Sequence, residues 1–308
     1  MKAKFHSPFR LDDTTGGSIF NKALFRWVKA RGFEIHYAQS PTPKRIEWIS
    51  SITHFLDGPF CRYPIKPKGK TIALMHLPAF ADPSASQQDS ANERGVLHDV
   101  SLIVVTHDRV KGEMEDCYSL PADKIITIEP GLAKSKHKNQ YSPIPSRLVY
   151  VSNFNPIKNH EGLMRLLSNI SDLNWNIDCY GAGELKPHIE ELCTSLGLEK
   201  KVNLLPPVPH KKLMTLLPTY DLALNFSLSE TYGMYIQECI GAGLPLLTSK
   251  VGWIQDRNYS GAIDPSFFQE QLVDTLTQTI KYQSLIRDTL ALSKMVKTWN
   301  FTPLEPWF

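Results

Sequence analysis

The chain has 308 residues, a length that allows two domains of ordinary size, and its 42% hydrophobic and 21% charged residues are typical of a soluble globular protein. A formal net charge of +3 is too small to indicate nucleic acid as a partner, and no apolar stretch is long enough to span a bilayer. Residues 1–13 lack the apolar core of a secretory signal, and the five cysteines are scattered without metal-type spacing. We therefore expect a cytosolic protein with reduced thiols and no nucleic-acid partner.

The first half of the chain reads as alternating strands and helices. Gly16 and Gly17 precede a helical run that ends at Gly32, in which apolar residues recur at helical spacing. Short apolar runs predict strands at residues 33–38, 52–57, 71–76, 101–106 and 124–129. Between the third and fourth of these strands, the polar residues 81–95 predict a mobile loop or a short helix.

A charged, polar and proline-containing segment, residues 134–146, has the composition of a linker between domains. The second half then alternates again, with strands predicted at residues 147–154, 174–181, 201–208, 221–227 and 244–249. Helices are predicted at residues 160–169, 184–197, 210–220 and 231–241, followed by one or two helices over residues 267–299.

This alternation predicts an α/β protein with two doubly wound, Rossmann-like domains facing a central cleft, which is a common place for a ligand. We expect the first domain at residues 1–140 and the second at residues 147–290. Residues 291–308 are expected to form a tail that packs back toward the first domain.

The most informative stretch is SETYGMYIQECIGAGLP, which lies between two apolar strands. Glu230 falls in the turn after the first of these strands, at the end where parallel sheets with crossover helices bind their ligands. A helix that starts near Thr231 places Glu238 about two turns further along, on nearly the same face. Two carboxylates so placed can grip ligand hydroxyls at two points, and the free amides of residues 231–233 can hold an anion.

A structural interpretation of the same residues stays open. Glutamates are common in the first turn of a helix because they favour the positive end of its dipole. Glu238 would then be a solvated or structurally paired residue, and the spacing alone does not decide between the two interpretations.

Further motifs accompany this stretch. Lys158 follows a strand, Gly181–Gly183 is a Gly-x-Gly, and residues 210–227 are a short helix before a strand that begins with Asp. The two glutamates Glu230 and Glu238 come next, and then a glycine and proline pattern at residues 241–247 and a later glycine, Gly252. In their order and spacing over about a hundred residues, the second half resembles the C-terminal domain of family 4 retaining glycosyltransferases, which have the GT-B architecture.

The first half shows looser likenesses to the same family. Gly16–Gly17 before a helix is similar to its N-terminal glycine loop, His76 to the histidine that ends one of its strands, and Gly131 to the glycine before its linker. The first domain is short for the family. One departure lies on the phosphate side, where Ser152–Asn153 replaces the family's arginine and leaves an uncharged amide there.

The resemblance implies a metal-independent hexosyltransferase that moves a sugar from a nucleoside-diphosphate sugar to an acceptor hydroxyl and retains the anomeric configuration. Its main task is to stabilise the negative charge that grows on the leaving diphosphate. The implied catalytic residues are His76, Lys158 and Glu230. The implied donor-binding residues are Gly16, Gly17, Asn153, Lys158, Pro207, Val208, Glu230, Thr231, Tyr232, Gly233, Met234 and Glu238.

The roles of these residues follow from the family. Lys158 would supply a point charge to the diphosphate, and backbone amides would supply N–H donors. Glu230 would contact hydroxyls of the donor sugar and Glu238 those of the ribose, while His76 would hydrogen-bond the donor sugar near the reacting carbon. A donor phosphate oxygen would take the acceptor proton, so no side-chain base has to be named.

No cofactor and no metal are expected, since the sequence has no Asp-x-Asp motif and no cluster of histidines and carboxylates with ligand spacing. The expected partners are the nucleotide sugar and a sugar, lipid-linked or other glycan acceptor, in glycan, lipopolysaccharide or glycoconjugate biosynthesis. The expected location is the cytoplasm, with weak peripheral contact at the inner face of the membrane. The oligomeric state stays open.

Two alternatives remain. A nucleotide-sugar epimerase or hydrolase on the GT-B fold would turn over the donor without an acceptor. A catalytically inactive GT-B binding protein is favoured by the missing arginine and the short first domain, while the two glutamates, Lys158 and His76 count against it.

Overall fold

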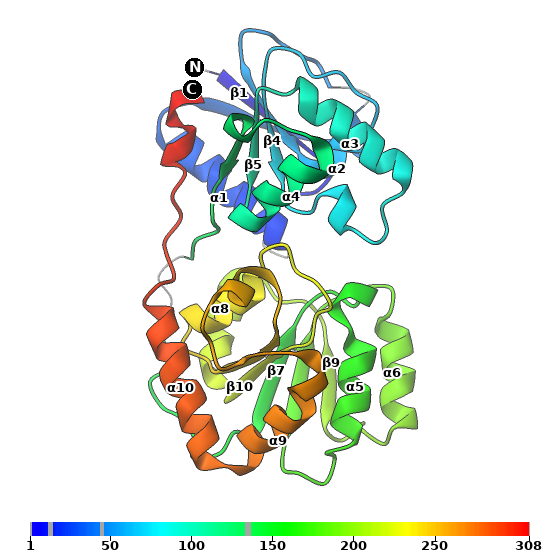
Figure 1. Ribbon diagram of the computed structural model, residues 1–308, viewed down its shortest axis with the longest axis vertical. Coiled ribbons are helices and arrows are strands. Elements are labelled where there is room, and N and C mark those ends of the chain that lie inside the picture. The colour runs from blue at the N-terminus through cyan, green and yellow to red at the C-terminus, as the bar shows by residue number, and fades with distance from the viewer. Residues whose placement is uncertain (1, 12–14, 44–45, 133–136, 308) are drawn as a thin grey trace. The chain divides into compact units, whose positions relative to one another are not determined.

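The computed structural model describes residues 2–11, 15–43, 46–132 and 137–307, and it divides the chain into two compact units (Figure 1). Unit 1 comprises Met1–Gly131 together with Trp299–Phe308, and unit 2 comprises Leu132–Thr298. The chain therefore passes between the units twice. Of the expected linker, residues 134–136 lie outside the described residues, whereas residues 137–146 belong to unit 2.

Unit 1 is a sheet of six parallel strands in the order β2-β1-β3-β4-β5-β6. The strands are β1 Lys2–Ser7, β2 Glu34–Gln39, β3 Thr53–Asp57, β4 Lys70–Met75, β5 Leu102–Val105 and β6 Ile125–Thr127. The connecting helices are α1 Gly16–Ala30, α2 Gly58–Cys61, α3 Gln87–Asp99 and α4 Asp108–Tyr118, with short 3-10 turns η2 Ala79–Ala81 and η3 Ala122–Lys124. Strands β3 and β5 are buried along their whole length, as expected for central parallel strands covered on both faces.

Local capping explains where two of these helices begin. The Thr15 side chain accepts from the Ser18 amide while Ser18 accepts from the Thr15 amide, so that both orphan donors at the start of α1 are satisfied. Ser86 and Asp89 form the same reciprocal pair at the start of α3. Of the polar segment 81–95, which was expected to be a mobile loop or a short helix, the residues from Gln87 onwards belong to α3, a helix of 13 residues.

Strand β1 lies next to β3 near the middle of the sheet, although the sequence pattern does not predict it. The polar residues Lys2, Lys4 and His6 alternate with smaller or apolar ones, so β1 lacks the continuous apolar run by which the other strands were predicted. His6 is nevertheless buried, because its Nε2 lies 2.9 Å from Nδ1 of His54 on β3. A partner 48 residues away in the sequence thus makes a polar position compatible with a central strand.

The C-terminal residues complete the core of unit 1. The ring of Phe301 packs edge-on against Phe20 of α1 at 5.3 Å between centroids and stacks on Trp299 at 5.7 Å. The last turn, η8 Thr302–Trp307, carries Glu305, which accepts from the Arg31 guanidinium over 2.8 Å. Aromatic burial thus holds the C-terminal segment against α1.

Unit 2 is a second sheet of six parallel strands, in the order β12-β11-β10-β7-β8-β9. The strands are β7 Arg147–Val151, β8 Asn176–Tyr180, β9 Val202–Leu205, β10 Leu222–Asn225, β11 Leu246–Ser249 and β12 Ala262–Ile263. The helices are α5 His160–Ser168, α6 Lys186–Ser195, α7 His210–Leu216, α8 Met234–Gly241, α9 Phe268–Thr277 and α10 Thr279–Ser293. Four 3-10 turns join them: η4 Pro156–Lys158, η5 Leu217–Thr219, η6 Gly252–Asp256 and η7 Pro265–Phe267.

Each sheet contains a point where the chain order reverses. In unit 1 this point lies between β1 and β3, and in unit 2 it lies between β7 and β10. Crossover connections leave such a pair of strands toward opposite sides, and ligands of open α/β sheets bind outside the carboxyl ends of that pair. The strand order therefore marks one position in each unit where a ligand is expected.

Candidate functional site

Lys158 and Glu230 meet at the switch point of unit 2. Lys158 ends η4, the turn that follows β7, and Glu230 lies in the loop that follows β10. The Lys158 Nζ and Glu230 Oε1 atoms are 2.5 Å apart, and both side chains are largely buried. The structure therefore brings together two residues that the sequence predicted for the same site.

The two loops that carry this ion pair are also joined through their backbones. The Leu228 amide donates to the Ile157 carbonyl over 2.8 Å. The hydroxyl of the fully buried Tyr150 donates to the Lys158 carbonyl over 2.8 Å and lies 3.2 Å from Ser227 Oγ. The position of the lysine is thus set by the core of unit 2 as well as by Glu230.

Helix α8 begins later than the sequence pattern predicts. Its first residue is Met234 rather than Thr231, because Gly233 adopts a left-handed conformation with φ 86° that a right-handed helix cannot include. Glu230 therefore stands in the turn before the helix, and the expectation that it shares a helical face with Glu238 is wrong. The amides without an intrahelical acceptor are those of the first turn from Met234 onwards.

Gly252 allows the turn around Glu230 to pack against η6. The Trp253 amide donates to the Tyr232 carbonyl over 2.9 Å. Gly252 has φ 63°, and a Cβ atom there would lie 2.3 Å from the Tyr232 carbonyl oxygen and 3.2 Å from Glu230 Cβ. A side chain at this position would therefore displace the turn that holds the carboxylate.

Glu238 lies within α8 and contacts a histidine of another helix. Its carboxylate oxygen Oε1 is 3.0 Å from Nε2 of His210, the first residue of α7, and only 5% of the Glu238 side chain is exposed. His210 directly follows the loop with Pro207 and Val208, of which Pro207 is exposed. The sequence did not single out the His210 side chain, since its spacing from Glu238 follows no local motif.

Asn153 and the Gly-x-Gly pair lie at the carboxyl ends of β7 and β8. Asn153 is exposed just beyond β7, as expected for a residue that faces solvent or a ligand. A Cβ atom at Gly181 would lie 1.9 Å from the Ser152 carbonyl oxygen, and the Phe154 amide donates to the Ala182 carbonyl over 2.9 Å. Gly181 therefore serves the close approach of two backbone segments.

In unit 1, His76 follows β4 and packs against the start of α1. Its Nε2 lies 2.8 Å from Oδ1 of Asn21, and a Cβ atom at Gly17 would lie 3.2 Å from its ring. Burial lowers the pKa of His76, although the charge of Asp57 acts in the opposite direction. His76 and the Gly16–Gly17 pair thus form one group within unit 1, with a neutral and oriented imidazole.

The switch point of unit 1 carries a buried polar pair that the sequence did not single out. Ser7, the last residue of β1, donates from Oγ to Oδ2 of Asp57, the last residue of β3, over 2.5 Å. Asp57 also accepts from the Gly58 amide over 3.1 Å. The sequence contained a signal for this pair, since both residues end strands that become neighbours, but the neighbour relation itself required the strand order.

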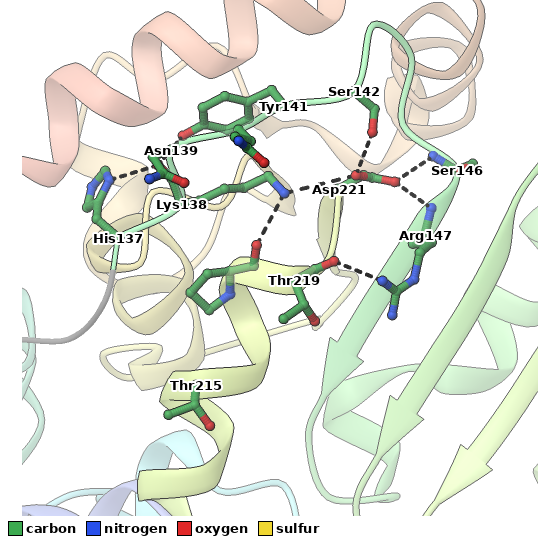
Figure 2. Close-up of a pocket in the computed structure, with 12 residues that line it drawn as sticks. His137, Lys138, Asn139, Tyr141, Ser142, Ser146, Arg147, Thr215, Thr219 and Asp221 are labelled. Carbon is green, nitrogen blue, oxygen red and sulfur yellow. Dashed lines mark hydrogen bonds and ion pairs between the residues drawn. The ribbon is translucent and has the colours of Figure 1, made fainter.

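In unit 2, a separate pocket of about 950 Å³ lies at the amino ends of β7 and β10, opposite to the carboxyl ends that are followed by Lys158 and Glu230 (Figure 2). Its polar groups hold the segment 137–146 in place. Lys138 donates to the Tyr220 carbonyl over 2.6 Å, and Asp221 accepts from Ser142 Oγ over 3.1 Å and from the Arg147 amide over 3.0 Å. These side chains are engaged in structural bonds, and the pocket contains none of the predicted site residues.

Among the residues that the structure describes, no three histidine, cysteine, aspartate or glutamate side chains are grouped so that they could hold a metal ion. Every helix in the described ranges is too short or too polar to traverse a bilayer.

Sequence comparisons find glycosyltransferases among the proteins that are similar to this chain. Residues 134–288 match the family model "Glycosyl transferases group 1". The chain is 22% identical over 236 residues to the D-inositol 3-phosphate glycosyltransferase of Nocardia farcinica, a match that covers 70% of this chain and 52% of the relative. The chain thus spans about half the length of the curated relatives it matches.

Solved structures share the fold at low sequence identity. Sucrose-phosphate synthase from Thermosynechococcus elongatus has a TM-score of 0.79 at 13% identity, over 97% of this chain and 95% of the other. Anabaena Alr3699/HepE in complex with UDP-glucose has a TM-score of 0.72 at 14% identity, over 97% and 96%. The GT-B fold expected from the sequence is confirmed. Since the family match extends over half of the chain and includes Lys158, Glu230 and Glu238, we conclude that this chain belongs to the group 1 glycosyl transferases.

Proposed function

We propose that the protein transfers a sugar from a nucleoside-diphosphate sugar to an acceptor hydroxyl and retains the anomeric configuration. The observation that carries this proposal is the Lys158–Glu230 ion pair at the switch point of unit 2, beside the start of α8. A cation, a carboxylate and the amides of a helix start are the groups that a diphosphate joined to a sugar requires.

The leaving diphosphate would be stabilised by Lys158 and by the first-turn amides of α8. Negative charge grows on the bridging oxygen as the sugar leaves, and preorganised cations and N–H groups stabilise that charge most strongly where water is excluded. Lys158 would exchange Glu230 for a phosphate oxygen when the donor binds. The carboxylate of Glu230 would then accept hydrogen bonds from hydroxyls of the donor sugar.

This scheme needs no metal ion, because Lys158 and the backbone amides provide the charge compensation. Asn153, which stands in place of the family's arginine, would add a neutral hydrogen-bond donor. Donor affinity should therefore depend more strongly on Lys158 than in relatives that have both cations.

Unit 1 contains groups of its own that are suited to binding sugar hydroxyls. His76 is oriented by Asn21 and held neutral by burial, so its imidazole can exchange hydrogen bonds with a sugar hydroxyl without adding charge. The buried Ser7–Asp57 pair offers a carboxylate with unused acceptor capacity at the switch point, where a hydroxyl of the acceptor would dock.

The identity of the nucleotide, the acceptor and the pathway can each be proposed as a chemical class. A UDP sugar is the first candidate, since the Anabaena protein with the same fold was solved with UDP-glucose. The acceptor would be a sugar, a lipid-linked glycan or another glycan. We place the enzyme in glycan or glycoconjugate biosynthesis, in the cytoplasm and peripherally at the inner face of the membrane.

Thermal unfolding with UDP, GDP, ADP and their sugar conjugates, without added metal, tests the donor site. A ligand present at a hundred times its dissociation constant stabilises the folded state by about 2.7 kcal/mol. We expect a rise in melting temperature with one nucleotide, and its loss in Lys158→Ala and Glu238→Ala. No rise with any nucleotide would contradict the proposal.

Turnover measurements then separate transfer from its alternatives. Consumption of the donor without an acceptor would indicate a hydrolase or an epimerase. The replacement of the family's arginine by Asn153 favours a binding protein as second candidate, and binding of the donor without turnover against any glycan acceptor would support it. With an accepted acceptor, the anomeric proton coupling in the product decides whether the configuration is retained.

A further inference from the structure

Glu238 is a buried carboxylate that lies beside a histidine. Its side chain is 5% exposed, and among the described residues its closest polar side-chain contact is His210, at 3.0 Å between Oε1 and Nε2. A carboxylate has about four acceptor positions on its two oxygens. A largely desolvated carboxylate with so few partners is costly, because each unmet acceptor loses its bonds to water. The arrangement leaves acceptor capacity for hydroxyl donors of a ligand.

His210 occupies a position that helix electrostatics disfavour. It begins α7 and is followed by Lys211 and Lys212, so three basic side chains stand at the positive end of the helix dipole. The preceding residue, Pro209, provides no side-chain cap. Basic residues at the positive end of a helix dipole, with no local acidic residue or cap to offset them, are typical of a functional position. The group that offsets them in this structure is the Glu238 carboxylate.

We propose that His210 is a positioning residue for the recognition of a ribose diol by Glu238. The imidazole lies against Oε1, with Nε2 at 3.0 Å, and so restricts the carboxylate to orientations in which Oε2 and the remaining acceptor positions are presented to the vicinal hydroxyls of the nucleotide ribose. His210 directly follows Pro207, Val208 and Pro209. The segment that precedes α7 would therefore contact the base, while the first residue of α7 orients the Glu238 carboxylate that binds the ribose. This inference rests on the proposed nucleotide-sugar donor.

A purely structural role gives a different expectation. His210 and Glu238 also connect α7 to α8, and loss of that connection would loosen both helices. In that case every nucleotide would bind more weakly, whether or not it carries ribose hydroxyls. Discrimination between a ribonucleotide and its 2′,3′-dideoxy form separates the two roles, since only orientation of the carboxylate toward the diol affects the ratio.

The experiment is a calorimetric titration with UDP, GDP and ADP, each beside its 2′,3′-dideoxy form, into the full chain and into His210→Ala and His210→Gln. In the unaltered protein, a hydroxyl donated to a carboxylate should favour the ribonucleotide by about tenfold or more. We expect His210→Ala to lower this ratio to about threefold or less, with the affinity for the dideoxy form little changed. His210→Gln, whose amide can contact and donate to Oε1, should restore most of the ratio.

The control is His188→Ala, which removes an exposed histidine 3.3 Å from Glu161 and far from the predicted donor residues in sequence. It should leave the ratio unchanged. An unaltered ratio in His210→Ala, or equal loss of both nucleotides, would overturn the inference while the proposed function stands. Absence of nucleotide binding in the unaltered protein would instead overturn the proposed function itself.

Discussion

The hydroxyl of Tyr150 donates to the carbonyl oxygen of Lys158 over 2.8 Å, from a tyrosine that is fully buried in the core of unit 2. The same hydroxyl lies 3.2 Å from Ser227 Oγ, at the end of the neighbouring strand. The Tyr150 hydroxyl thus anchors the backbone of the turn that carries Lys158, and the Glu230 carboxylate holds the Lys158 ammonium group. Two independent contacts therefore fix one cation, and each can be removed separately.

Tyr150→Phe should weaken nucleotide binding with a modest loss of stability. The ring and its packing stay, but the Lys158 carbonyl loses its buried donor, which costs about 1–2 kcal/mol in the free energy of unfolding. Tyr141→Phe is the matched control, since its hydroxyl donates to the Gly243 carbonyl over 2.8 Å and Tyr141 lines the pocket at the amino ends of β7 and β10. We expect similar denaturation midpoints for the two variants and lower nucleotide affinity only for Tyr150→Phe. Equal affinities would show that the anchor does not act on the site.

Glu230→Gln should separate binding of the nucleotide from binding of the sugar. Removal of the carboxylate frees the Lys158 ammonium, so the affinity for the nucleoside diphosphate should stay the same or rise. The affinity for the sugar conjugate should fall, by about tenfold for a lost hydrogen bond to a charged group. Lys158→Met should instead lower the affinity for both ligands. Titration calorimetry checks all four values, and parallel losses of both ligands in Glu230→Gln would contradict the exchange of partners.

Gly252→Ala should disrupt the Glu230 turn. Its Cβ atom would lie 2.3 Å from the Tyr232 carbonyl oxygen, in addition to the strain of a left-handed backbone. Gly197→Ala is the matched control, because Gly197 has φ 67° but no atom within 4 Å of an added Cβ. The control should lose about 1 kcal/mol of stability from backbone strain alone. Gly252→Ala should lose more and should also lose nucleotide binding, as measured by urea unfolding and by ligand-induced stabilisation.

Unit 2 should lose stability as the pH falls below 6.5. His160 is stacked between the rings of Phe154 and Tyr150, and burial, with a smaller contribution from the Lys158 charge, lowers its pKa to about 3. Below pH 6.5 the histidine of the unfolded chain binds a proton, whereas His160 of the folded unit stays neutral until about pH 3. The free energy of unfolding is therefore unaffected by His160 above pH 6.5 and decreases as the pH falls from 6.5 toward 3. Between pH 6.5 and 5 the loss is about 2 kcal/mol.

Unfolding at pH 7 and pH 5 checks this dependence. His160→Gln should show a smaller difference in unfolding free energy between the two pH values than the unaltered protein. His36→Gln, a change at an exposed histidine, should leave the difference unchanged. An equal pH dependence in all three proteins would assign the acid sensitivity to other groups.

Local signals predicted most elements of the fold but misplaced one boundary that matters. Helix α8 was predicted from Thr231, since its apolar periodicity extends that far, whereas the left-handed Gly233 delays its start to Met234. The conformation of Gly233 is not readable from its neighbours, because glycine occupies either sign of φ with similar ease. Strand β1 was missed for the complementary reason, as His6 reads as a surface residue until His54 is placed beside it.

The sequence by itself determined the alternation of strands and helices, the residue types of the site and the resemblance to a glycosyltransferase family, because periodicity, capping and short motifs act over a few residues. Only the tertiary structure decided which side chains meet. Lys158 and Glu230 are 72 residues apart, and neither His210 and Glu238 nor Ser7 and Asp57 share a local motif. These contacts depend on the order of the strands in each sheet. Burial of whole sheet faces and closure of long loops set this order, so a short stretch of sequence cannot predict it.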